Sequence, residues 1–325
     1  MKLHTVTVTA RERAELVERD HEPAPLGPHD VAGPTLATVV SAGTELASCY
    51  LAGTFPRTPG YAAVFEAREI GSEVADVEPG DRLFCMGGHR SYQRVSRADA
   101  VRVPDGLPDG VAVFARMMGI SMSTLTTTAA RPPDRVLVTG LGLVGNLAAR
   151  IFARCGYAVA AVDPLEPRRQ LAQDAGIGTV LPAVPLDDAR FAGKIALAVE
   201  CSGHEQATLD ACRIVRKRGE VVLVGVPWER RTDLTAHDLL HAVFHQYAVV
   251  RSGWEWELPR HPADFRGNSM FDNFAAALRW LAEGSIRVDG LAVARPPREA
   301  QAAYQDILHR RGPALTTVFD WTDCP

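Results

Sequence analysis

Several kinds of sequence feature are missing from this 325-residue chain. A membrane-spanning helix needs about eighteen uninterrupted apolar residues, and no stretch of the sequence is close to that length. No membrane association is therefore expected. The six cysteines form no CxxC pair, which argues against a disulfide framework and a four-cysteine zinc knuckle. The formal net charge of −4 offers no basic field for nucleic acid or an anionic membrane. There is also no internal repeat and no low-complexity tract.

What remains is an ordinary globular composition, 46% hydrophobic and 23% charged. The first residues alternate as a β-strand does and then become charged, which is unlike a signal peptide. Together with the scattered cysteines, this favours a reducing, cytoplasmic compartment. A length of 325 residues exceeds what one core usually serves, so two domains are expected. The partner expected from these features is a small-molecule substrate.

One stretch organises the rest of the chain, residues 135–163, RVLVTGLGLVGNLAARIFARCGYAVAAVD. An apolar β-type run ends in the pattern G-x-G-x-x-G, a helix-period segment follows, and a second β run comes after it. Gly140 allows a tight turn, Gly142 lets the backbone approach a pyrophosphate, and Gly145 lets the helix pack closely on the strand. A glycine-rich turn in another kind of parallel sheet is the alternative, but strand, helix and the acid described next favour dinucleotide binding.

The residues around this loop predict how a dinucleotide is held. The helix start, with Leu143 and Val144, directs free N–H groups and a partial positive charge at the phosphate. Asp163 lies 23 residues after Gly140, where a carboxylate can accept hydrogen bonds from the ribose and repel a 2′-phosphate. This favours NAD(H). Arg168 can either clamp a phosphate or simply face solvent, so NADP(H) stays open.

The pattern of the whole chain predicts an α/β protein with three segments. Residues 1–121 contain short strands with Pro/Gly-rich joints, which is typical of a barrel-like β domain. Residues 122–255 alternate apolar strands with helices, which is typical of a doubly wound parallel sheet. Residues 256–325 supply two helices and a closing strand, which we interpret as a return segment that completes the first domain.

The motifs of the chain resemble, in order and spacing, the medium-chain dehydrogenase/reductase superfamily of alcohol dehydrogenases and quinone reductases. The resemblance is carried by residues 39–45, 59–61, 77–82, 140–145, 198–203, 219–227 and 281–286. It implies a GroES-like β-barrel domain and a Rossmann domain, with the active site in the cleft between them. It also implies a homodimer formed through edge strands of the Rossmann sheets, for which residues 248–252 are the candidate.

The departures from the superfamily concern zinc. Zinc enzymes have Cys-Gly-Thr-Asp where residues 42–45 read AGTE, and Gly-His-Glu where residues 60–62 read GYA. Catalytic zinc would need a thiolate and an imidazole there, and a further ligand cysteine is replaced near Ile120. The structural zinc lobe is absent too, because Cys85 leads directly into the next strand. We therefore expect no zinc, and the motifs resemble a zinc-less branch that includes bacteriochlorophyllide-type alcohol dehydrogenases and natural-product redox enzymes.

Without the metal, a positioned hydrogen-bond donor has to stabilise the charge that develops on the substrate oxygen. Tyr61 takes the place of the lost histidine ligand and is either this donor or an aromatic filler of the empty metal site. Thr44 matches the hydroxyl of the family's proton relay and is otherwise a turn residue. Glu45 is expected to be structural, bonding backbone or an arginine such as Arg116. His89, in a loop, is either a catalytic acid or base near neutral pH or simply solvated.

The resemblance also implies the remaining cofactor contacts. Ser123 and Thr124 match the segment that approaches the nicotinamide. Gly225 and Val226 follow the strand whose end lies by the carboxamide, and Cys201 ends the strand before it.

The leading hypothesis is a zinc-independent NAD(P)(H) oxidoreductase that acts on an alcohol/carbonyl pair, in specialised metabolism. A reductase of an activated C=C bond, such as an enone or quinone, is the second hypothesis. Such relatives usually use NADPH, so Asp163 argues against it. A catalytically inactive dinucleotide-binding protein is the third, and the retention of Thr44 with a complete glycine loop argues against that.

Overall fold

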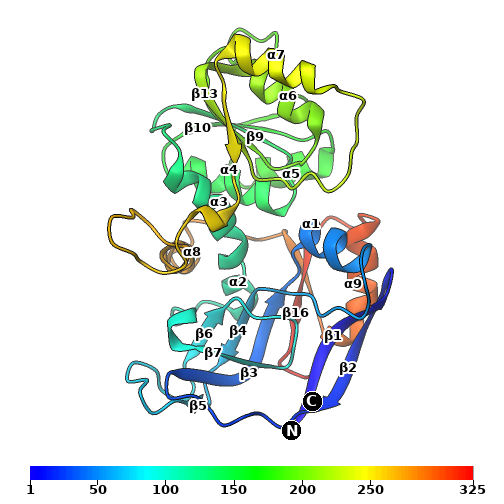
Figure 1. The fold of residues 1–325 in the computed structure, drawn as a ribbon, viewed down its shortest axis with the longest axis vertical. Coiled ribbons are helices and arrows are strands. Elements are labelled where there is room, and N and C mark those ends of the chain that lie inside the picture. The colour runs from blue at the N-terminus through cyan, green and yellow to red at the C-terminus, as the bar shows by residue number, and fades with distance from the viewer. Residues whose placement is uncertain (325) are drawn as a thin grey trace. The chain divides into compact units, whose positions relative to one another are not determined.

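The computed structural model describes residues 1–324, which form two compact units (Figure 1). Unit 1 comprises Met1–Arg116, Phe274–Gly284 and the residues from Val288 onward. Unit 2 comprises Met117–Asn273 and Ser285–Arg287. Unit 1 is therefore discontinuous in sequence, and residues 256–273, which the sequence pattern assigned to the return segment, lie in unit 2.

Unit 2 is built on a six-stranded sheet in the order β11-β10-β9-β12-β13-β14, in which every neighbouring pair is parallel. Its strands are β9 (Arg135–Thr139), β10 (Ala158–Val162), β11 (Thr179–Leu181), β12 (Ile195–Glu200), β13 (Val215–Leu223) and β14 (Val249–Ser252). The order confirms the predicted doubly wound sheet. Because the chain proceeds in opposite directions from β9, the loops that follow β9 and β12 diverge at a topological switch point, where such sheets bind ligands.

Helices cover both faces of this sheet. They are α4 (Leu143–Arg154), α5 (Glu166–Asp174), α6 (Glu205–Ile214) and α7 (Ala236–Gln246), with α3 (Ala115–Thr127) entering from unit 1. Along β9 the side chains alternate between two cores. Val136 and Val138 pack with α4 residues such as Phe152, whereas Leu137 packs with α6 residues such as Leu209. Strands buried on both faces explain the nearly continuous apolar runs in the sequence.

Unit 1 is centred on β3 (Asp30–Val39), which pairs with four other strands, β4, β5, β7 and β16. The other strands are β1 (Lys2–Ala10), β2 (Arg13–Asp20), β4 (Ala63–Glu66), β5 (Glu69–Ile70), β6 (Arg82–Cys85), β7 (Tyr92–Ser96), β8 (Ala100–Arg102), β15 (Ala292–Arg295) and β16 (Thr316–Asp320). The first half of β3 pairs with β7 and its second half with β4 and β16, as expected for a strongly bent strand in a barrel-like unit.

The remaining elements of the chain are short helices and two longer ones near the C-terminus. They are α1 (Ala42–Glu45), a π-helix (Leu46–Tyr50), α2 (Asp109–Ala112), α8 (Met270–Ala282), α9 (Ala300–Leu308) and 3-10 turns at Arg97–Asp99, Glu255–Glu257 and Pro297–Glu299. The elements that were not predicted are β2, the helical segment over residues 42–50, β15 and the 3-10 turns at Arg97–Asp99 and Glu255–Glu257. The segment over residues 42–50 matters most, because it carries the AGTE motif.

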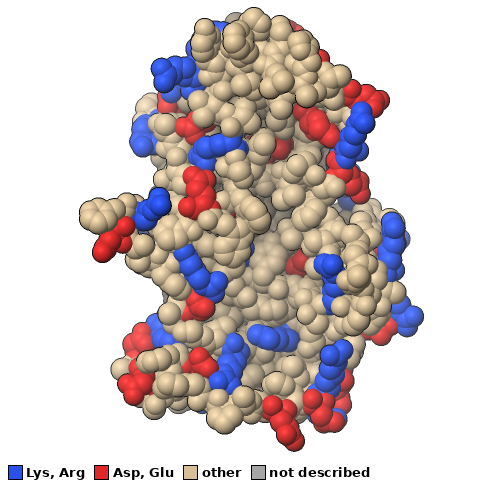
Figure 2. All heavy atoms as spheres, in the orientation of Figure 1, with Lys and Arg blue, Asp and Glu red and all other residues tan. Residues whose placement is uncertain are grey.

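The surface of the molecule carries both signs of charge. Figure 2 shows Lys and Arg side chains interspersed with Asp and Glu on the face drawn, without a broad area of one sign. Within residues 1–324, no helix combines the length and apolar character needed to cross a bilayer.

Candidate active site

The loop after β9 gives each of its three glycines a different task. Gly140 has φ +81°, a conformation that suits glycine, and an added Cβ would lie 2.8 Å from Ser202 atoms. A Cβ on Gly145 would lie 1.8 Å from the carbonyl oxygen of Gly140 and 3.0 Å from Cβ of Cys201. A Cβ on Gly142 would meet nothing within 4 Å. Gly140 and Gly145 therefore shape the loop, whereas Gly142 faces open space that a bound group can enter.

The N-terminus of α4 is open to a ligand. Gly142 is its N-cap, and no side chain caps the helix start. By contrast, α6 is capped by His204 and α7 by a capping box of Thr235 and Asp238. The N–H groups in the first turn of α4, from Leu143 onward, are thus left for a partner such as phosphate. This arrangement fits the pyrophosphate of a dinucleotide.

Asp163 follows β10 and is 2% exposed. Its carboxylate accepts hydrogen bonds from the backbone N–H of Leu141 (2.8 Å) and of Leu165 (2.9 Å). Arg168, on α5, forms an ion pair with it at 3.4 Å. In the sequence, Asp163 favoured NAD(H) and Arg168 left NADP(H) open. In the structure the two side chains form an ion pair, so part of the carboxylate charge is compensated.

The ends of β12 and β13 lie beside the glycine loop. A Cβ on Gly225 would come within 2.4 Å of the Gly203 nitrogen and 2.6 Å of the Cys201 carbonyl carbon, so these turns touch through backbone. Cys201 is partly exposed, and burial together with the neighbouring Glu200 raises the pKa of its thiol well above the usual range. Val226 is 49% exposed. The turn therefore presents Val226 and backbone, and not a reactive thiolate.

Glu200 is a residue of this region that sequence reasoning did not single out. It is fully buried, and its oxygens accept hydrogen bonds from the N–H groups of Ser202 (2.7 Å) and Gly203 (3.0 Å) and from the Thr139 hydroxyl (3.3 Å). Burial raises its pKa, and these hydrogen bonds oppose the shift. Glu200 thus ties the end of β9 to the turn after β12. Its position at the end of an apolar strand was the only signal in the sequence.

Ser123 and Thr124 lie on α3 and are almost fully buried. The Ser123 hydroxyl donates to the Gly119 carbonyl oxygen at 3.0 Å. The Thr124 hydroxyl has no hydrogen-bond partner among the described residues, which makes it available to a bound group. The start of α4 is linked to the same helix, because the Ser121 hydroxyl donates to the Val144 carbonyl oxygen at 3.0 Å.

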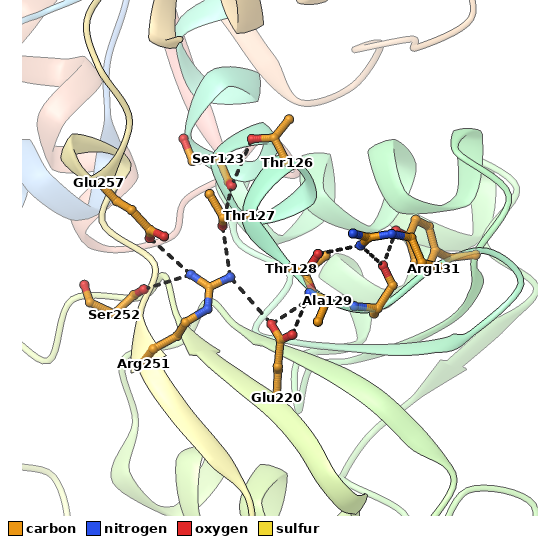
Figure 3. A network of polar contacts seen from close by, with 12 residues as sticks. Ser123, Thr126, Thr127, Thr128, Ala129, Arg131, Glu220, Arg251, Ser252 and Glu257 are labelled. Carbon is orange, nitrogen blue, oxygen red and sulfur yellow. Dashed lines mark hydrogen bonds and ion pairs between the residues drawn. The ribbon is translucent and has the colours of Figure 1, made fainter. Parts of the chain in front are cut away.

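A polar network holds the end of α3 in place (Figure 3). Arg251 of β14 donates to the Thr127 hydroxyl at 2.9 Å, and that hydroxyl donates to the Ser123 carbonyl oxygen at 2.8 Å. Arg251 also forms an ion pair with Glu220 of β13 at 3.6 Å. Glu220 in turn accepts a hydrogen bond from the Thr128 hydroxyl at 2.9 Å. The helix that carries Ser123 is thereby fixed to the last two strands of the sheet.

In unit 1, Tyr61 and Thr44 are brought together. The Tyr61 hydroxyl donates a short hydrogen bond to Ser41 Oγ, and the Thr44 hydroxyl lies near enough to lower the pKa of the phenol. The Arg116 guanidinium lies over the Tyr61 ring, 4.7 Å from its centroid. Burial raises the pKa of the phenol, while the charge of Arg116 and the hydroxyls of Ser41 and Thr44 pull it down. Sequence reasoning named Tyr61 and Thr44 and missed Ser41.

His89 is not a solvated loop residue: its side chain has no exposed surface. Its Nδ1 lies 2.8 Å from the Thr38 hydroxyl, and its Nε2 lies 3.0 Å from the Glu45 carboxylate. Trp321 N–H, which can only donate, occupies the Thr38 oxygen at 2.9 Å. The assignment that satisfies all partners has Thr38 donating to Nδ1 and Nε2–H donating to Glu45. His89 thus joins Thr38 of β3 to Glu45 of α1 inside unit 1.

Glu45 is structural and bonds backbone, as expected. It also bonds two side chains that the sequence did not indicate. It is 1% exposed and accepts hydrogen bonds from the Ser41 backbone N–H (2.7 Å), from His89, and from the Tyr304 hydroxyl (2.6 Å). Gly60, with φ +99°, allows this packing, because a Cβ on residue 60 would lie 2.6 Å from the backbone nitrogen of His89. The AGTE and PGY motifs therefore meet around the buried side chains of Glu45 and His89.

The donor set of this assembly does not fit a zinc ion. The superfamily's ligand positions carry Ala42 and Tyr61 here, and the nearby Glu45 and His89 bond each other. Across residues 1–324, no three His, Cys, Asp or Glu side chains are grouped so that they can hold a metal ion.

Comparisons with known proteins agree with this fold. A family described as "Zinc-binding dehydrogenase" matches residues 143–257. An alcohol dehydrogenase from Geobacillus stearothermophilus is 25% identical over 210 residues, which cover 54% of this chain and 62% of that relative. L-galactonate-5-dehydrogenase from Escherichia coli (strain K12) is 26% identical over 296 residues, 79% of this chain and 82% of that relative. The chain thus matches about three fifths of the first relative's length.

A solved structure extends the likeness to the whole chain. Galactitol-1-phosphate dehydrogenase from Escherichia coli superposes with a TM-score of 0.81 over 98% of this chain and 100% of that chain, at 19% identity. The fold is therefore the GroES-like domain plus Rossmann domain that the motifs predicted. In sequence the chain is thus similar to an alcohol dehydrogenase and to L-galactonate-5-dehydrogenase, and in fold it is similar to galactitol-1-phosphate dehydrogenase.

Proposed function

We propose that this chain is a nicotinamide-dependent oxidoreductase that moves a hydride between its cofactor and an alcohol/carbonyl pair without zinc. The observation that carries the proposal is the cluster of Ser41, Thr44 and Tyr61 hydroxyls under the Arg116 guanidinium. Within this cluster, Tyr61 stands at a motif position where zinc enzymes of the superfamily have a histidine ligand, and Thr44 matches the hydroxyl of their proton relay. A cluster of this kind can give a proton to an oxygen that becomes negative, and this stabilises the charge that the metal stabilises as a Lewis acid in the zinc enzymes.

The residues of unit 2 are the proposed cofactor site. When bound, a nicotinamide dinucleotide supplies or accepts the hydride. The open start of α4 and Gly142 receive the pyrophosphate, and Asp163 accepts hydrogen bonds from the ribose. Thr124 offers an unpartnered hydroxyl to the part of the cofactor that approaches α3. In this scheme Gly140, Gly145, Cys201 and Gly225 act through backbone packing.

We propose NAD(H) as the preferred cofactor because the Asp163 carboxylate would repel a 2′-phosphate. NADP(H) is the alternative, because Arg168 lies beside Asp163. If Arg168 turned toward a 2′-phosphate, its guanidinium could form charge-assisted hydrogen bonds with that phosphate. An NADP(H) preference would favour the second function, reduction of an activated C=C bond. The motif resemblance to zinc-less enzymes of natural-product pathways points to an alcohol or ketone of specialised metabolism as substrate.

We propose a homodimer as the working assembly, formed through β14. This strand is at one end of the sheet order, and its Val249 is 48% exposed. An unpaired strand edge is a template for pairing with a second copy. Light scattering coupled to gel filtration would measure the mass of the particle in solution.

The function is tested by titrating metal-stripped protein with NADH and NADPH and assaying it against a panel of alcohols and ketones, with metal content measured on the same sample. We expect nucleotide binding, and activity that survives EDTA. Tyr61→Phe should lower kcat by about 10²-fold or more while nucleotide affinity stays unchanged. The matched control is Tyr247→Phe, which removes a phenol that is 68% exposed on the C-cap of α7. Stoichiometric zinc, with activity lost on chelation, would overturn the metal-free proposal.

A further inference from the structure

The chemistry proposed for Tyr61 raises a physical difficulty. A phenol that gives up its proton becomes a phenolate, and a buried phenolate without partners is costly because the charged form loses its hydration. Burial is also the largest influence on the Tyr61 pKa, and it acts upward. Proton transfer through Tyr61 therefore needs groups that stabilise the phenolate inside the protein.

Two such groups contact Tyr61 in unit 1. The Arg116 guanidinium, itself 3% exposed, stacks on the face of the ring at 4.7 Å and also contacts the Phe274 ring at 5.6 Å. Ser41 Oγ is the hydrogen-bond partner of the phenolic oxygen. A hydroxyl can rotate, so Ser41 can accept from the phenol in one state and donate to the phenolate in the other.

The position of Ser41 is fixed by a hydrogen bond of its backbone to Glu45. Its backbone N–H donates to Glu45 at 2.7 Å, and Glu45 is fixed by His89 and Tyr304. The charged groups that face the phenol are Arg116, which favours phenolate, and Glu45, which disfavours it. Arg116 makes direct contact with the ring, whereas the Glu45 oxygens are occupied by three donors. Arg116 and Ser41 thus oppose the upward effect of burial on the Tyr61 pKa, although that pKa stays above its usual value.

We propose that Arg116 and Ser41 are the positioning residues that make the partly buried Tyr61 phenol usable for proton transfer, Arg116 through its charge against the ring and Ser41 through its hydrogen bond. This inference rests on the proposed function. In the reduction direction, a bound reduced nicotinamide would supply hydride to the carbonyl carbon. The Tyr61 O–H bond breaks, and its proton passes to the carbonyl oxygen. The electron pair of the broken bond stays on Tyr61 as phenolate beside Arg116 and Ser41, and solvent later returns the proton.

The first test measures ionisation and needs no substrate. Tyrosinate absorbance is titrated in the full chain without nucleotide, and the curve of the matching Tyr61→Phe protein is subtracted to isolate Tyr61. We expect Arg116→Gln and Ser41→Ala each to move the Tyr61 titration to higher pH, and Arg116→Lys to move it back toward wild type. Tyr247→Phe, which lies under Lys217 at 5.9 Å on the exposed surface, serves as the control and should change nothing at Tyr61.

The second test measures the rate with whichever panel substrate is turned over. Arg116→Gln should lower kcat about tenfold at neutral pH, with little change in KM. The double variant Arg116→Gln/Tyr61→Phe should be no slower than Tyr61→Phe alone, because Arg116 acts through Tyr61. A purely structural role for Arg116 would instead make the two losses add.

The outcomes separate the two proposals. A Tyr61 titration that is the same in wild type, Arg116→Gln and Ser41→Ala overturns this inference, whether or not the protein is an oxidoreductase. Shifted titrations without turnover of any alcohol or ketone support the inference about Tyr61 and overturn the proposed function. If Arg116→Gln does not fold, Ser41→Ala decides alone, because it removes one hydroxyl at a helix start where no side-chain cap is formed.

Discussion

Gly142 and Gly145, three positions apart in one loop, are predicted to respond in opposite ways to the same substitution. In Gly145→Ala, the new Cβ would lie 1.8 Å from the Gly140 carbonyl oxygen, so the helix start and the loop would have to separate by roughly 1.5 Å to reach ordinary contact. Overpacking against backbone costs about 1–3 kcal/mol, which corresponds to a fall in Tm of about 2–4 °C per kcal/mol in a domain of this size. In Gly142→Ala, φ is −63° and the Cβ meets nothing within 4 Å, so stability should stay the same or rise by about 0.4–1 kcal/mol.

For nucleotide binding, we expect Gly142→Ala to have the larger effect of the two variants. The Cβ in Gly142→Ala points into the space assigned to the pyrophosphate, so NADH affinity should fall at least about tenfold, or about 1.4 kcal/mol, in a protein that is fully folded. Thermal unfolding and calorimetric titration with NADH on each variant give the two quantities. Gly178→Ala is the control, because its Cβ also meets nothing within 4 Å but lies before β11, away from the loop. Unchanged NADH affinity in Gly142→Ala, or unchanged Tm in Gly145→Ala, would refute these roles.

Three further predictions concern buried charges and the cofactor. Glu45→Gln leaves three donors facing one acceptor oxygen, so denaturant unfolding should show a loss of about 2–4 kcal/mol, and a loss below about 0.5 kcal/mol would contradict the network. Arg168→Ala should weaken NADPH binding more than NADH binding in paired titrations, and equal effects would mean that Arg168 does not face the 2′ position. Burial raises the folded-state pKa of Glu200 above its ordinary 4.5, so the stability that Glu200 contributes is full below that pH and declines as the pH rises through the folded pKa. Glu200→Gln should therefore gain stability relative to wild type over that rise, and a pH-independent difference between the two would contradict the shift.

Much of the fold could be predicted because its signals are local. The inner strands of unit 2 are largely buried on both faces, so their apolar runs are nearly continuous and predicted a parallel sheet. The strand β2 was missed because its exposed face is charged and only Ala14 is buried. Its pairing with β1 over residues 2–20 depends on the turn between them and on side-chain pairs such as Lys2–Glu18, which no periodicity reveals.

The helical segment over residues 42–50 was missed for a different reason. It is a four-residue α-helix followed by a π-helix of five residues, too short for a periodic pattern. What holds it is packing: Tyr50 stacks on Tyr304 at 5.0 Å, and Glu45 bonds to the same Tyr304. The sequence indicated Thr44 as a candidate, but it did not show that the nearby Glu45 and Tyr50 are buried against Tyr304.

By itself, the sequence determined the glycine loop, the alternation of strands and helices in unit 2 and the residue types at the positions of the superfamily's zinc ligands, because each depends on backbone conformation or spacing within some thirty residues. Only the tertiary structure decided which side chains act together. Glu45, His89 and Tyr304 are up to 259 positions apart, and Tyr61 gains Ser41 and Arg116 as partners through folding alone. Hydrogen bonds and charge contacts act over a few ångströms in space and leave no regular trace along the chain, so the tuning of the Tyr61 phenol could be read only from the folded protein.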